Sequence, residues 1–100
     1  MQRKPRLEWR PAARADLLEI VAYIARDNPN AAQELKDEIE AKAAKLPDNP
    51  KLYKASARVK GMRELVARGN YIVLYRETPQ CVEIVNVVHA RRQWPPRRQM

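Results

Sequence analysis

The spacing of apolar residues changes halfway along the chain, and this change limits the folds open to it. Between Pro11 and Leu46 apolar residues recur at three- and four-residue intervals, as in amphipathic helices. Beyond Met62 they form short runs of Val, Ile, Leu and Tyr separated by turn signals, as in strands. A chain of 100 residues has room for one modest core. We therefore expect a single domain over residues 1–100, of the α+β class.

The first half predicts two helices. Pro11 suits the first turn of a helix whose apolar face includes Leu17, and Leu18 and Val21 widen that face enough to predict burial of much of the helix. The second helix follows Asn28, a plausible N-cap, and runs to about Leu46. Because so few residues separate the two helices, we expect an antiparallel helical hairpin.

The sheet is expected to have three or four mainly antiparallel strands. A short N-terminal strand over residues 6–9 precedes the helices, and strands over residues 62–67, 71–76 and 81–89 follow them. In the last strand, apolar residues occupy both alternating sets, which predicts a central strand covered on both faces. The helical hairpin can cover only one face. Either a second copy of the protein or another chain then covers the second face, on which simple alternation places Val85 and Val87, and we favour another chain.

The charge is distributed unevenly. Residues 1–50 carry 9 Lys and Arg against 9 Asp and Glu, whereas residues 51–100 carry 11 against 3, so the net charge of +8 arises in the second half. Self-repulsion of this kind works against folding, so we interpret it as a basic sheet that meets an anionic partner.

Other classes of site and location find little support in the sequence. With one His and one Cys, no metal site is expected, and with two glycines there is no glycine-rich phosphate loop, so no cofactor is predicted. No apolar run approaches the length of a membrane span, and the N-terminus lacks the apolar stretch of a signal peptide. We expect a cytoplasmic protein without a membrane partner.

The order strand, helical hairpin and three strands resembles the ParE/RelE superfamily of toxins from toxin–antitoxin modules. The specific part of the resemblance is Gly61-Met-Arg63-Glu-Leu65, then Asn70-Tyr71, then His89-x-Arg91. Within the superfamily the chain looks most like the ParE branch. This resemblance implies a RelE/ParE-like fold and the toxin of a type II, plasmid stabilisation-type module. It also implies inhibition of DNA gyrase by binding, and neutralisation by a cognate acidic antitoxin in a hetero-oligomer.

The alternative is a RelE-like, ribosome-dependent mRNA endoribonuclease. Such an enzyme needs a base, an acid and charge stabilisation at the scissile phosphate. Arg63 and Arg91 stand about where two basic residues of that branch would, and His89 is a candidate acid or base. Ile72, however, occupies a position where that branch has Arg, and residues 93–100 contain no Tyr. We therefore interpret the chain as acting by binding rather than by catalysis.

The candidate contact residues fall into two groups. Tyr71 and Tyr75 share a strand face, either as packing or as a stacking surface, and the strand register decides whether His89 joins them. The predicted antitoxin contacts are Leu18, Val85 and Val87. The predicted target contacts are Arg63, Tyr71, Tyr75, His89, Arg91, Arg92 and Trp94.

Overall fold

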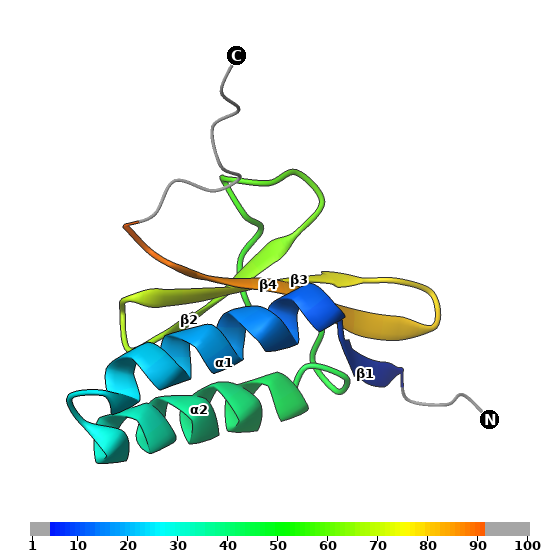
Figure 1. Cartoon of the computed structure of the whole chain (residues 1–100). Helices are drawn as coiled ribbons and strands as arrows, with labels where there is room; N and C mark the ends of the chain where they lie inside the picture. The colour runs from blue at the N-terminus through cyan, green and yellow to red at the C-terminus, as the bar shows by residue number, and fades with distance from the viewer. Residues whose placement is uncertain (1–4, 92–100) are drawn as a thin grey trace.

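A computed structural model describes residues 5–91 of the chain. Two helices lie side by side on one face of a four-stranded sheet (Figure 1). The predicted α+β class and the order of the elements are confirmed. The elements are β1 (Arg6–Trp9), α1 (Pro11–Ala25), α2 (Pro29–Ala44), β2 (Arg63–Ala67), β3 (Tyr71–Glu77) and β4 (Cys81–His89).

The helices begin where the sequence predicts. Asn28 caps α2, because its side-chain oxygen accepts a hydrogen bond from the Ala31 amide at 3.0 Å. The end of α2 lies two residues before Leu46, although Leu46 is still fully buried. The predicted burial around α1 is wrong: Leu18 is 61% exposed, because α2 and the sheet cover only part of that helix. Neither helix is long and apolar enough to cross a bilayer.

The strands are arranged in the order β1-β4-β3-β2. The predicted central position of β4 is confirmed, since it pairs in parallel with β1 and antiparallel with β3. The turn between β2 and β3 uses the left-handed conformation at Arg68 and Gly69, with φ angles of 56° and 68°. Glycine adopts such angles at little cost, which explains the predicted turn at this point.

The face of the sheet beneath the helices holds the larger core. Leu17 of α1 and Leu35 and Ile39 of α2 pack there against strand residues that include Val73 and Ile84. All five are at most 5% exposed. This layer orients α1 across the ends of β3 and β4, where the candidate site lies.

The opposite face is covered by the chain itself. Ile72, Leu74 and Val88 form a small buried cluster there, and Val59 and Met62 pack against it. These two residues belong to the segment between α2 and β2, which passes to the side of the sheet away from the helices (Figure 1). The prediction that another chain must cover this face is therefore wrong for these residues.

A β-bulge in β4 reverses the alternation of side chains. Leu74 pairs with Asn86 and Tyr75 with Ile84, so Val85 has no partner on β3. Beyond this point Val87 belongs to the core beneath the helices. The prediction that Val87 faces away from the helices is wrong, because alternation fails at an inserted residue. Val85 itself is half-buried.

Candidate functional site

Tyr71 and His89 lie together at one end of the sheet. They are directly paired across β3 and β4, and their rings meet edge to face with centroids 5.1 Å apart. The His89 Nδ1 atom accepts a hydrogen bond from the Arg91 amide at 3.1 Å, which fixes the ring. This register places His89 on the same face of the sheet as Tyr71 and Tyr75, one of the two possibilities that the sequence left open.

Tyr75 lies in the protein interior. It has no exposed surface, its hydroxyl donates to the Pro50 carbonyl at 3.0 Å, and its ring meets Tyr53 edge to face. Burial raises its pKa above the ordinary value of a tyrosine. Tyr75 therefore packs the core, and its predicted contact with a target is wrong for this conformation.

Arg63 and His89 are not brought together. Arg63 pairs with Tyr75 and His89 with Tyr71, so they are four residues, or about 13 Å, apart along β3. The Arg63 Nη1 atom donates to the Tyr53 carbonyl at 2.7 Å, which ties it to the neighbouring segment. Arg91 is exposed two residues after the end of β4. Arg92 and Trp94 lie outside the described residues.

A hollow of about 490 Å³ opens between α1 and the ends of β3 and β4. Asp16 is fixed at its wall, because its Oδ2 atom accepts from the Asn86 side chain at 2.9 Å and from the Val87 amide at 3.0 Å. Sequence reasoning found Tyr71 and His89 but missed the residues from α1. The α1 residues of the lining recur at three- and four-residue intervals, so the sequence could have shown that they share one face of the helix. The lining residues are Asp16, Glu19, Ile20, Tyr23, Tyr71, Val87, Val88 and His89.

Leu18 is the predicted antitoxin contact that remains accessible on the described surface of α1. Val87 is 3% exposed beneath α1, so a partner could reach only the edge of its side chain that lines the hollow. Tyr23, which was not predicted, is 70% exposed near the end of the same helix.

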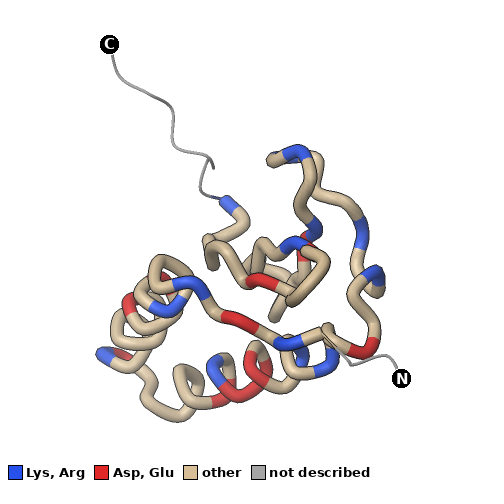
Figure 2. Tube along the Cα trace, turned by 90° about the vertical axis from the view of Figure 1, so that its right-hand side faces the viewer, with Lys and Arg blue, Asp and Glu red and all other residues tan. Residues whose placement is uncertain are grey.

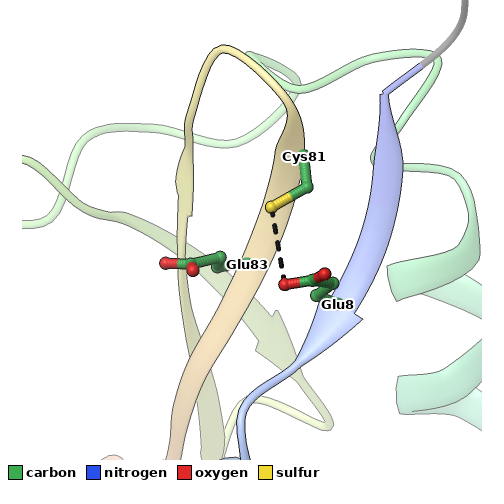
Figure 3. A group of neighbouring side chains, drawn as sticks. All are labelled: Glu8, Cys81 and Glu83. Atoms are coloured by element: carbon green, nitrogen blue, oxygen red, sulfur yellow. Dashed lines mark hydrogen bonds between the residues drawn. The ribbon is translucent and has the colours of Figure 1, made fainter.

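The parallel pairing of β1 and β4 gathers three potential metal ligands, Glu8, Cys81 and Glu83. Figure 3 shows the Cys81 thiol directed at Glu8, to which it donates at 3.7 Å, and one ligand atom from each of the three residues lies within 4.8 Å of the others. Glu83 is held by Arg76 at 2.7 Å and by Arg10 at 3.6 Å, and the hydrogen bond from Arg76 lowers the pKa of its carboxyl group. Both carboxylates and the thiol are thus engaged in ion pairs or hydrogen bonds within the protein.

The positive charge is not on the sheet. The four strands together carry three Arg and four Glu, which corrects the expectation of a basic sheet. The segment over residues 51–62 instead carries Lys51, Lys54, Arg58 and Lys60 with no acidic residue. Figure 2 shows this stretch with blue positions alone, while both colours occur along the helices.

Comparisons with known proteins agree with this fold. A solved structure described as "Chromosomal ParDE TA system from P. aeruginosa" contains a chain with the same fold, with a TM-score of 0.76 and 19% identity over 86% of this chain and 96% of that one. "Putative toxin Y4kP" of Sinorhizobium fredii (strain NBRC 101917 / NGR234) is 41% identical over 96 residues, covering 95% of this chain and 97% of the relative. Residues 7–94 match the family described as "ParE toxin of type II toxin-antitoxin system, parDE". This chain therefore belongs to the ParE toxin family.

Proposed function

We propose that this toxin arrests growth by binding DNA gyrase, and that a cognate antitoxin neutralises it. Membership of the ParE family supports the toxin role, and the family implies an antitoxin partner. Gyrase as the target follows from the resemblance to the ParE branch. Such a target places the action of this toxin in the cytoplasm.

The separation of Arg63 from His89 is the observation that favours binding over catalysis. General acid–base catalysis needs groups within hydrogen-bond reach of one substrate. These two side chains start from strands on opposite sides of β3, offset by about 13 Å along it, and Arg63 already donates to Tyr53 within the fold. The candidate nuclease residues therefore do not form one compact set.

The proposed target surface combines exposed positive charge with the end of β4. Arg91 and the four basic residues of the 51–62 segment are exposed. Arg58 of this segment lies beside the end of β4, because its Nη2 atom donates to the Ala90 carbonyl at 3.1 Å. Arginine and lysine side chains on such a surface attract anionic groups and speed association. Arg92 and Trp94 remain proposed contacts, next in sequence after this end of the sheet.

The test is controlled expression of the toxin and its variants, with folding checked by circular dichroism. We expect His89→Ala to retain growth arrest, because binding requires no proton transfer. We expect Arg91→Ala combined with Arg92→Ala to weaken it, because each well-formed contact to a charged group contributes about 1.5–3 kcal/mol. Arg26→Ala combined with Lys45→Ala removes two exposed charges at helix ends and should have little effect.

Two measurements separate the target classes. Gyrase supercoiling in vitro should fall with added toxin, and mRNA in the arrested cells should stay intact. A ribonuclease would lose roughly a hundredfold or more in cleavage rate with an acid–base group removed. If folded His89→Ala protein lost all toxicity, and mRNA were degraded by the parent alone, the binding proposal would be wrong.

A further inference from the structure

The hollow beside α1 is acidic on a strongly basic protein. Asp16 and Glu19 line it, and among residues 5–91 no Lys or Arg forms an ion pair with either. Asp16 uses Oδ2 for its two hydrogen bonds, so Oδ1 keeps its capacity to accept others. Glu19 is exposed at the rim. The local charge is thus opposite in sign to the net charge of +8.

The rest of the lining is apolar and aromatic. Ile20 and Val87 supply aliphatic surface, and the rings of Tyr23, Tyr71 and His89 surround it. Tyr71 and His89 hold each other in a fixed edge-to-face arrangement. Aromatic rings beside carboxylates suit a planar cation carried on an aliphatic stem, because the stem packs on apolar surface and the cation binds rings and carboxylates.

We propose that this hollow binds an arginine side chain of the antitoxin, an inference that rests on the antitoxin partner given under the proposed function. The guanidinium group donates to Asp16 and Glu19 and stacks on the tyrosine rings, while the stem contacts Ile20 and Val87. Arginine fits this lining better than lysine, because its planar group both stacks and pairs with carboxylates. An antitoxin that is acidic overall therefore carries at least one basic anchor.

The chemistry of the lining argues against two other occupants. An anion would meet Asp16 and Glu19 with the same sign of charge, which is unfavourable. A bare metal ion would gain nothing from the aliphatic and aromatic wall and prefers several oxygen ligands around one point. A free polyamine shares the cationic chemistry of arginine and is therefore a separate arm of the test.

The experiment follows backbone amide signals of the isotope-labelled toxin by NMR during titration with Nα-acetyl-arginine N-methylamide. We expect saturable shifts confined to the lining residues, with those of Val87, Val88 and His89 as reporters. The citrulline analogue has nearly the same shape without the charge and should bind at least about tenfold more weakly, as expected when charge-assisted hydrogen bonds become neutral ones. The positive net charge of the toxin repels the probe elsewhere, which sharpens the localisation.

Two carboxylate variants form a matched pair. Glu19→Gln should weaken binding about two- to fivefold, the range typical of exposed ion pairs. Glu77→Gln makes the same charge change at an exposed position at the other end of β3 and should leave binding unchanged. If both variants weakened probe binding equally, the effect would come from the change in net charge rather than from Glu19, and the proposal would be wrong.

The remaining outcomes decide the source of the cation. In the toxin–antitoxin complex the arginine probe should no longer shift the reporter signals, because the antitoxin fills the hollow. Binding to the complex as strong as to free toxin, tighter binding of spermidine than of arginine, equal binding of the citrulline analogue, or no saturable shift would each overturn the proposal. The titration does not require toxicity. If the protein bound the probe but failed to arrest growth, the proposed function would be wrong and this inference would stand.

Discussion

The two faces of the sheet are buried by different kinds of structure. Beneath α1 and α2 lies a core of thirteen buried residues contributed by both helices, by Leu46 after α2 and by all strands except β1. The other face has a cluster of three buried apolar residues, covered by an irregular segment rather than by a helix. The helical face is thus stabilised mainly by apolar packing, and the other face needs additional polar anchoring.

That anchoring comes from Glu64, the one buried charged residue in the described chain. The Ser56 hydroxyl donates to Glu64 at 2.7 Å and accepts from the amides of Arg58 and Val59. Arg58 pairs with Glu64 at 3.5 Å and donates to the Ala90 carbonyl at 3.1 Å. A single acidic side chain therefore helps to hold a segment that carries four positive charges, and the comparison shows that this segment serves both as cover and as charged surface.

The largest expected effect is on the helical face. Ile84→Ala should lower the free energy of unfolding by about 4 kcal/mol, because a well-packed core collapses little around a cavity. Ile84 is fully buried among residues of both helices and the sheet. Urea denaturation followed by circular dichroism measures the change. If Ile84→Ala lowered the unfolding free energy less than Ile72→Ala does, the two faces would not differ as proposed.

The same substitution on the opposite face should cost less. Ile72 is 4% exposed, and the irregular segment that covers it can move into the cavity left by a smaller side chain. Ile72→Ala should therefore lower the unfolding free energy by about 2 kcal/mol, near the lower limit for such changes. The two variants remove the same atoms from neighbouring strands. The difference between their unfolding free energies therefore reflects how rigidly the helices and the irregular segment pack on the sheet. Equal losses would mean that the segment packs as rigidly as the helices.

Loss of the polar anchor should loosen the segment more than it destabilises the fold. Glu64→Ala removes the acceptor for Ser56 and Arg58, and should cost about 1.5 kcal/mol, because both partners can still reach water. Hydrogen exchange should accelerate over residues 54–62, with little change in α2. Exposed Glu77→Ala is the control and should change neither quantity. Unchanged exchange in Glu64→Ala would show that apolar packing alone holds the cover.

The smallest effect concerns the helical face and depends on pH. Hydrogen bonds from Lys42 and Arg68 lower the pKa of Glu38 below its ordinary value of 4.5, so folding favours the charged carboxylate. This stabilisation is present above the unfolded-state pKa and is lost as the pH falls through the lower folded-state value. The stability difference between the parent and Glu38→Gln should be less than about 1 kcal/mol at neutral pH and should vanish in acid.

Unfolding curves from pH 7 to pH 2, with and without added salt, measure that difference. Salt should reduce it, because the pair is partly exposed. A difference that grew as the pH fell would contradict the assigned direction of the pKa shift.

Local features were predictable because their causes are local. Asn28 and Pro29 start α2, and Arg68 and Gly69 form the turn before β3, each through side-chain or backbone preferences that act over a few residues. The family resemblance was likewise carried by short stretches of sequence. Tyr71 and His89, which the sequence offered as candidate contacts, lie together beside a hollow, in a register that the sequence left open.

The distribution of side chains between the two faces was not predictable in the same way. Strict alternation misplaced Val87, because one unpaired residue at Val85 exchanges the faces beyond it. The positive charge of the second half was assigned to the sheet, whereas four of its basic residues lie in the irregular segment over residues 51–62. The cover has no periodic pattern, so no sequence signal predicted it.

By itself the sequence determined which segments are helical and extended, where they begin, and the net charge of +8, since each depends on nearby residues or on composition. The tertiary structure alone decided which face each β4 side chain occupies, what covers the second face, and that Asp16 meets Asn86 and Val87 beside a hollow. Those contacts join residues about seventy positions apart, and they depend on a register that a single bulge changes.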